Sequence, residues 1–355
     1  MAHNYTERDG MFVVREPSWH GLETEVFEDY PTREQAQQVA HPWEPVSEPV
    51  YRQVPEVIIR DKHPGESWCS PDCPGPRHVE QVAQVRYEQI EEAQAIVRSD
   101  TGDTLGVVSG TYEPIRNEEM YDIAEAIEGE AKGSVRFETG GSLKGGRKVW
   151  LLIRLTEPLV LREDAITATI PYYALQNAHD GSSSFRGQAT MTRIVCDNTA
   201  QLADMDASAR GTEFVFRHTV NVKQRIEEAK AALSGWREGL REWRLMQESL
   251  LDVRVTPEQM LEFEERFIPM PPPHVVSSRV VNNVEAARNQ FRSILTGSTL
   301  EGVEESAYGL VQASVEYLNH YRKARTQETR FRRAYLDRNR VVTDAVELVR
   351  EIAHV

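Results

Sequence analysis

The chain has 355 residues and a formal net charge of −15, from 41 lysine and arginine and 56 aspartate and glutamate residues. With 40% hydrophobic residues, the composition is that of a folded protein of roughly two or three domains and excludes disorder throughout. No stretch of about 18 apolar residues could span a membrane. The polar N-terminus lacks the apolar core of a signal peptide, and three cysteines are too few for a disulfide framework, so we expect a cytoplasmic protein.

Residues 1–88 are predicted to form an N-terminal arm with a loop-like insert. A short helix is expected at Pro31 to Ala40, because proline is favoured in the first turn of a helix. The separated aromatic residues Phe12, Trp19 and Trp43 are expected to dock the arm onto a larger body. Residues 61–77 are rich in proline, glycine and cysteine, which predicts an irregular loop.

This insert carries a candidate structural zinc site. Its four nitrogen and sulfur ligands would be His63, Cys69, Cys73 and His78. A metal could replace the missing core of such a short segment. The spacing differs from that of standard zinc fingers, so a loop with two free thiols is the alternative. No other cofactor is predicted.

Residues 89–215 are predicted to form an α+β core domain. A hairpin joins Gln94–Arg98 to Thr104–Val108, and a helix capped by Asn117 runs to Gly129. Further strands are expected at Ser134–Glu138, Lys148–Leu155, Ala165–Leu175 and Gly187–Val195. The order of a hairpin, a helix and then strands predicts a mainly antiparallel sheet.

Residues 216–355 are predicted to form a helical C-terminal module, because apolar residues recur there at helical spacing. The expected helices are Val222–Leu250, Pro257–Phe267, Val284–Leu295, Glu304–Tyr321 and Val341–Ile352.

Several stretches of the sequence resemble the phage/plasmid-like protein family. They are Pro17–Leu22, Arg98–Asn117, Gly140–Trp150, Asn177–Arg186, Arg193–Thr199, Phe216–Thr219 and Ser306–His320. The resemblance implies a protein carried by phages, prophages or plasmids and a domain of unknown function, and it supplies no catalytic residues. The element order is also similar to that of RecT/Erf-type annealing proteins, which form rings or filaments without a nucleotide cofactor.

Two polar connections of the predicted sheet carry candidate nucleic-acid ligands. The glycine-rich segment Thr139 to Lys148 would expose backbone N–H groups to a phosphate, with charge from Lys144, Arg147 and Lys148. It lacks the ending of a Walker motif. A plain glycine hairpin with solvated cations is the alternative.

The second connection, Asp180 to Arg186, combines three serine hydroxyls with Arg186, which suits a phosphodiester. Arg193 would extend the groove, and Phe185 or Tyr112 would stack on bases. A structural turn is the alternative. A hydrolytic relay through His179 and Asp180 is disfavoured, because adjacent strand residues point to opposite faces.

A basic run extends from Tyr321 to Arg340. It holds eight lysine and arginine residues against two acidic ones, with three aromatic residues among them. Cations interleaved with aromatic rings suit single-stranded nucleic acid. A solvated helix whose cations pair with the acidic N-terminal arm explains the run equally well.

These features favour binding over catalysis. We expect a homo-oligomer that binds single-stranded DNA or anneals strands during replication or recombination, without a membrane partner. The alternative is a homo-oligomeric scaffold or a modulator of a host protein, for which an acidic surface is also suited. A metal-dependent nuclease would need convergent carboxylates, for which Asp103, Glu113, Glu118 and Asp180 are the candidates.

Overall fold

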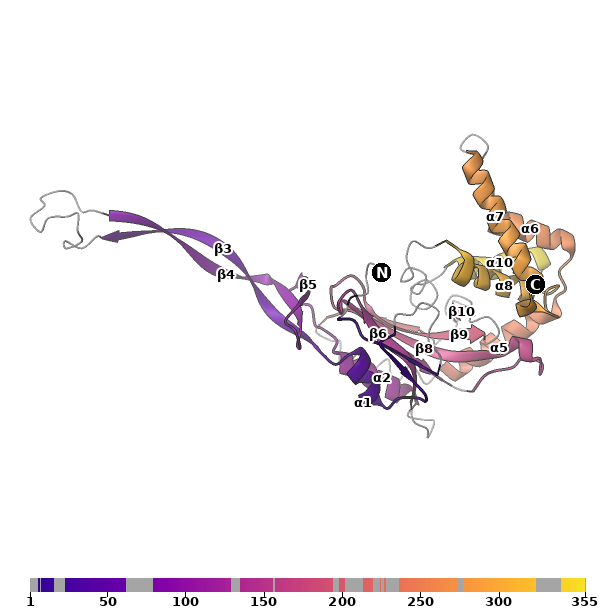
Figure 1. Cartoon of the computed structure of the whole chain (residues 1–355), viewed down its shortest axis with the longest axis horizontal. Helices are drawn as coiled ribbons and strands as arrows, with labels where there is room; N and C mark the ends of the chain where they lie inside the picture. The colour runs from indigo at the N-terminus through magenta and orange to yellow at the C-terminus, as the bar shows by residue number, and fades with distance from the viewer. Residues whose placement is uncertain are drawn as a thin grey trace, which may run out of the picture.

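The computed structural model describes residues 6, 8–15, 23–61, 79–128, 135–155, 157–193, 198–201, 213–219, 224, 227, 236–272, 277–323 and 340–354. A long two-stranded ribbon projects from a body in which a large sheet carries helices on one face and at one end (Figure 1). The predicted α+β class, with a mainly antiparallel sheet followed by C-terminal helices, is confirmed.

The large sheet has eight strands in the order β10-β9-β8-β7-β6-β1-β2, and β11 also pairs with β9. Its strands are β1 Met11–Val14, β2 Glu25–Phe27, β6 Arg136–Leu143, β7 Lys148–Arg154, β8 Thr169–Ala178, β9 Phe185–Arg193, β10 Asn198–Gln201 and β11 Glu213–Phe216. Pairing is antiparallel except between β1 and β2. The short turns from β6 to β9 produce this meander, because a tight turn can only join antiparallel neighbours.

Two strand boundaries differ from the prediction. Strand β6 continues through the glycines to Leu143, so the predicted glycine-rich connection is only the turn at 144–147. These glycines permit close strand packing, since a Cβ on Gly141 would lie 2.7 Å from the Gly10 carbonyl oxygen. Strand β8 begins at Thr169, because Ala165–Thr167 forms the 3₁₀ turn η1.

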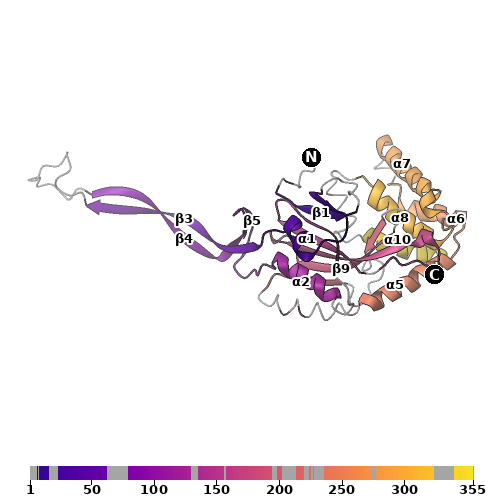
Figure 2. The same cartoon turned by 60° about the horizontal axis from the view of Figure 1, so that its bottom comes forward.

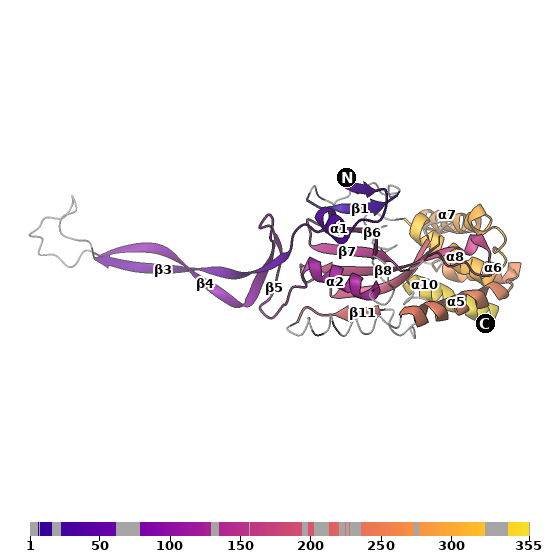
Figure 3. The ribbon, with the colours of Figure 1, turned by 90° about the horizontal axis from the view of Figure 1, so that it is seen from below.

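Helices α1 Arg33–Ala40 and α2 Asn117–Glu128 cover one face of this sheet (Figure 3). Helix α1 begins with a capping box, in which the Thr32 side chain accepts from the Gln35 N–H and Gln35 bonds back to Thr32. Buried residues of both helices share one core with the strands, including Ala36, Tyr121 and Phe12. Both predicted helices are confirmed, and Phe12 and Trp43 pack in the core as expected. Trp19 lies outside the described residues.

The ribbon is made by β3 Pro45–Asp61 and β4 Val79–Arg98, and β5 Thr104–Ser109 pairs with the base of β4. The predicted β4–β5 hairpin is confirmed. The length of β3 and β4 is not predicted, because valines and tyrosines alternate there with charged residues outside any recognised turn signal. The ribbon leaves the body in a second view as well (Figure 2). The candidate zinc ligands at 63, 69, 73 and 78 lie outside the described residues, between these strands.

The C-terminal helices gather at the far end of the large sheet (Figure 1). They are α5 Trp236–Asp252, α6 Pro257–Phe267, α7 Ser278–Leu295, α8 Ala307–Glu316 and α10 Arg340–Ala353, with the 3₁₀ turn η4 Ser298–Leu300 and the π-helical turn η5 Tyr317–Tyr321. All ten residues of α8 are buried, and α5, α7 and α10 pack around it. Most of the predicted basic run, residues 324–339, lies outside the described residues. Among the helices described, none is long and apolar enough to cross a membrane.

Candidate anion-binding pocket at the glycine-rich turn

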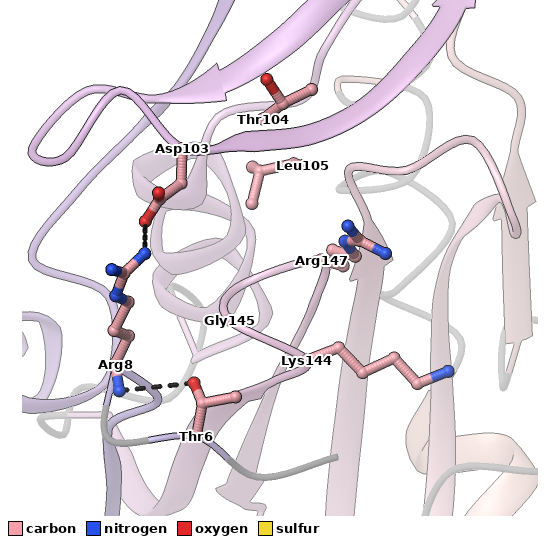
Figure 4. Close-up of a pocket in the computed structure, with 8 residues that line it drawn as sticks. All are labelled: Thr6, Arg8, Asp103, Thr104, Leu105, Lys144, Gly145 and Arg147. Carbon is pink, nitrogen blue, oxygen red and sulfur yellow. Dashed lines mark hydrogen bonds and ion pairs between the residues drawn. The ribbon is translucent and has the colours of Figure 1, made fainter. Parts of the chain in front are cut away.

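A pocket of about 520 Å³ opens where the N-terminal segment, the β4–β5 hairpin and the β6–β7 turn meet. Its lining residues are Thr6, Arg8, Asp103, Thr104, Leu105, Lys144, Gly145 and Arg147 (Figure 4). The volume is in the range of small-ligand sites. Three of these residues are cations and one is an anion, so the pocket is locally positive on an acidic chain.

The β6–β7 turn has an unusual backbone that its residues explain. Lys144, Gly145 and Gly146 follow one another with φ values of 59°, 71° and 95°. Glycine adopts such angles without the steric cost that other residues meet. At Gly146 a side chain is also excluded by contact, because a Cβ would lie 2.5 Å from the Trp43 ring. The glycines therefore serve a tight turn that packs against a buried indole.

The carboxylate of Asp9 holds this turn from inside. Asp9 is 3% exposed and accepts hydrogen bonds from the backbone N–H groups of Gly145 and Gly146, both at 3.0 Å. It also accepts from the Ser142 hydroxyl at 3.0 Å and from the Thr6 N–H at 2.8 Å. The prediction that the turn's N–H groups face a phosphate is therefore wrong, because a side-chain carboxylate already occupies that position.

Arg98 braces the opposite side of the turn. Its guanidinium lies 4.4 Å from the centre of the Trp43 ring and donates to the backbone carbonyls of Arg8 at 3.1 Å and Gly145 at 3.2 Å. Two further bonds, of 3.0 and 2.8 Å, bind both carboxylate oxygens of Asp100. The Arg98 guanidinium lowers the pKa of Asp100. Arg98 is 4% exposed, so it positions the pocket and is not open to a ligand.

The remaining pocket cations differ in how they are paired. Arg8 forms an ion pair with Asp103, and hydrogen bonds from Thr101 and Arg8 lower the pKa of that carboxyl group. Within the described part of the chain, the side chains of Lys144 and Arg147 have no hydrogen-bond or ion-pair partner. Figure 4 shows them on the other side of Gly145 from Arg8. Two unpaired cations beside one pocket suit an anionic ligand.

The other predicted nucleic-acid ligands are not gathered at this pocket. Lys148 begins β7, and Arg186 lies on β9 with its guanidinium 3.7 Å from the Glu213 carboxylate. The strand register places Arg186, Gln176 and Trp150 in one row across three strands. Because side chains alternate along a strand, Lys148 lies on the same sheet face as this row. For Arg193, the structure describes only the backbone in β9.

The two predicted stacking residues are both engaged in packing. Phe185 is fully buried, with ring centres 5.3 Å from Phe214 and 6.4 Å from Phe216. Its predicted stacking on a base is wrong, because no face of the ring is free. The Tyr112 ring stacks on His218 with centres 4.6 Å apart, and its hydroxyl donates to the Ala178 carbonyl at 3.0 Å.

Three buried histidines lie behind the pocket wall without forming a catalytic relay. His179 Nε2 bonds to Asn117 Oδ1 at 3.0 Å, while Asp180 caps the Ser182 N–H at 2.9 Å. His41 bonds to Tyr121 and the Gly141 carbonyl, and His218 to Asn177. Burial lowers the pKa of His41 and His218 to about 4 and that of His179 to about 3. Neutral imidazoles satisfied by amides and carbonyls indicate a structural role.

The family profile described as "Domain of unknown function (DUF932)" matches residues 104–340, more than half of the chain. The chain belongs to the DUF932 family. The predicted membership of a family of unknown function is thus confirmed, while a phage or plasmid origin stays a prediction. The DUF932 region supplies Thr104, Lys144 and Arg147 to the pocket, and residues before it supply Thr6 and Arg8. No curated protein matches the chain, and no solved structure does.

Sequence reasoning identified Lys144 and Arg147 but missed Arg8, Asp9 and Arg98. Arg98 and Asp100 stand in the stretch that carries the family resemblance, and their close spacing is the local signal that was available. Asp9 gave no such signal, because its bonds to the turn cross more than 130 residues of sequence. Among the described residues, no group of three histidine, cysteine, aspartate or glutamate side chains could hold a metal ion.

Proposed function

We propose that this DUF932 protein binds single-stranded nucleic acid through the pocket at the β6–β7 turn. The observation that carries the proposal is that the unpaired side chains of Lys144 and Arg147 line one pocket. Lysine and arginine neutralise phosphates, and the hydroxyls of Thr6 and Thr104 are suitable secondary donors. The acidic remainder of the surface would disfavour adhesion elsewhere.

The proposed mechanism is electrostatic and involves no covalent step. A phosphate would bind to the two side chains and not to the turn's N–H groups, which Asp9 occupies. Affinity would come from the release of counterions, and Arg186 would extend the contact along the sheet face. Such binding fits an accessory of strand annealing during replication or recombination, carried by a phage or plasmid and acting in the host cytoplasm.

Fluorescence anisotropy of a labelled single-stranded oligonucleotide at several salt concentrations tests this proposal. The Lys144→Ala/Arg147→Ala double variant is expected to weaken binding and to reduce the salt slope by about 1.4, since each cation on a single strand contributes about 0.7. Arg254→Ala is the matched control, because this 89% exposed arginine lies outside the pocket and pairs with Glu305. No binding at low salt, or equal effects of both changes, would refute the proposal.

A second candidate function is self-association as an interaction protein. The observation that favours it is the projecting ribbon of β3 and β4, whose length exceeds what a turn on a compact body requires (Figures 1 and 2). A nuclease is not supported by the described carboxylates, since Asp103 pairs with Arg8, Glu118 pairs with Arg116 and Asp180 caps a turn.

A further inference from the structure

The two faces of the β3–β4 ribbon differ in chemistry. The register pairs Tyr51 with Gln89, Gln53 with Tyr87, Pro55 with Val85 and Val57 with Ala83. Because successive residues of a strand point to opposite sides, these pairs share one face. We call the residues Tyr51, Pro55, Val57, Val85 and Tyr87 the apolar ribbon face.

The apolar ribbon face is open to solvent. Tyr51 is 52% exposed, Val85 49%, and both Val57 and Tyr87 62%. Large apolar side chains that line up on one projecting element mark an interaction surface more often than scattered ones do. Gln53 donates to the Tyr87 hydroxyl at 3.3 Å, which steadies this ring in the middle of the face.

The opposite face is charged. Arg52 faces Glu88 across the ribbon, and their ion pair has an N–O distance of 2.7 Å. Arg86 also pairs with Glu88, and Glu56 follows on the same face. The ribbon is therefore amphipathic, with its ion pairs on one side and its aromatic and aliphatic side chains on the other.

The ribbon lacks the support that an isolated pair of strands needs. Among the described strands, β3 pairs only with β4, and β5 reaches β4 only from Ala93 to Val97. A two-stranded hairpin with no third layer is marginally stable in water. Packing its apolar face against another surface would supply the missing layer.

The edge of β3 is closed to strand addition, which directs association to the face. Pro49 and Pro55 lie within β3 and have no N–H group to donate to a further strand. Prolines on an edge strand are a recognised protection against edge-to-edge pairing. A partner would thus bind through side chains and not by extending the sheet.

Charge and size indicate what the partner is. The chain carries −15, so two copies repel over most of their surfaces, whereas the described apolar ribbon face has no charged residue. A ribbon of 17 residue pairs is about 55 Å long and about 10 Å wide, so that two such faces would bury about 1,100 Å² in total, close to the lower limit for a specific interface. We propose that the apolar ribbon face packs against the same face of a second copy of this chain in a two-fold symmetric dimer.

This inference rests on the self-association part of the proposed function and not on nucleic-acid binding. Because the interface is small, the dimer is expected to dissociate on dilution. A charge placed in it would face its symmetry copy, so one substitution acts twice.

Sedimentation velocity of the full chain over a wide concentration range tests the proposal. Val85→Glu is expected to raise the dimer Kd by about a hundredfold or more. Gln84→Glu is the matched control, because this exposed neighbour adds the same charge to the opposite face, and its Kd should stay within about threefold of the wild-type value. Circular dichroism should show both variants folded, since both positions are exposed.

A wild-type chain that is monomeric throughout would overturn the proposal and assign the face to a different protein. A dimer that Val85→Glu and Gln84→Glu affect equally would overturn it too. Oligonucleotide anisotropy separates the two proposals, because loss of the dimer leaves Lys144 and Arg147 in place. Binding without a ribbon dimer refutes only this inference, and a ribbon dimer without binding refutes only the proposed nucleic-acid function.

Discussion

Substitution of Asp9 is the sharpest test of how the pocket is held together. In Asp9→Ala, the Gly146 N–H and the Ser142 hydroxyl lose their acceptor in a buried site. Each unsatisfied buried group costs about 1–2 kcal/mol, and the half-buried Gly145 N–H adds less, so the free energy of unfolding should fall by about 3–4 kcal/mol. Urea titration followed by tryptophan fluorescence measures this loss.

Asp9→Asn separates charge from shape in the same site. The amide keeps the size of the carboxylate but turns one acceptor into a donor that faces N–H or O–H groups. We expect a loss of about 2 kcal/mol, since hydrogen bonds to a charged acceptor are stronger than neutral ones. An asparagine variant as stable as the wild type would refute the assignment of Asp9 as the internal anion of the turn.

A small carboxylate should restore part of the lost stability in the alanine variant. Formate can occupy the vacated position between the Gly145 and Gly146 N–H groups, and a ligand that binds only the folded state raises its stability. The Tm of Asp9→Ala should therefore rise with formate, at constant ionic strength, more than that of the wild type. Equal responses, or a loss below about 1 kcal/mol for Asp9→Ala itself, would contradict the reasoning.

Three further predictions concern stability. Gly146→Ala should cost about 2–4 kcal/mol in urea, from the positive φ and the Trp43 contact, whereas Gly102→Ala, with no atom within 4 Å of its Cβ, should cost only about 1 kcal/mol. Arg292→Leu removes the two 2.6 Å bonds to Glu264, which is 3% exposed, and should cost about 2 kcal/mol; a loss below about 0.5 kcal/mol would refute this. Acidification from pH 6.5 towards 4 should lower stability, because unfolding raises histidine pKa values from about 3–4 to about 6.5 and takes up three protons. Burial raises the pKa of Glu44 to about 7, which offsets one proton and leaves about 2.7 kcal/mol per pH unit; constant stability between pH 6.5 and 5 would contradict the burial of the three histidines, His41, His179 and His218.

Local signals in the sequence determined several elements of the fold. Helix α6 has the predicted bounds, because Thr256 caps it, Pro257 opens it and apolar residues recur along it. Helix α2 and the β4–β5 hairpin were predictable for the same reason, since caps and turns act over a few residues. The cations Lys144 and Arg147 were identified because they share one turn.

Only the tertiary structure decided what surrounds those cations. The carboxylate of Asp9 reaches the turn across the sheet, and Arg98 approaches it from the ribbon. Neither contact leaves a periodic or short-range pattern, because the partners are brought together by strand pairing between distant segments. The glycine N–H groups were therefore assigned to a phosphate when an internal anion holds them.

The ribbon and the core aromatic residues show the same limit. Alternating strand residues can be exposed on either side, so the sequence of β3 and β4 did not reveal that their apolar face lies open in solvent. Phe185 looked available for stacking until Phe214 of a later strand was found against it. Sequence determined which residues can bind an anion or an apolar partner, and the packing of distant segments decided which of them are free to do so.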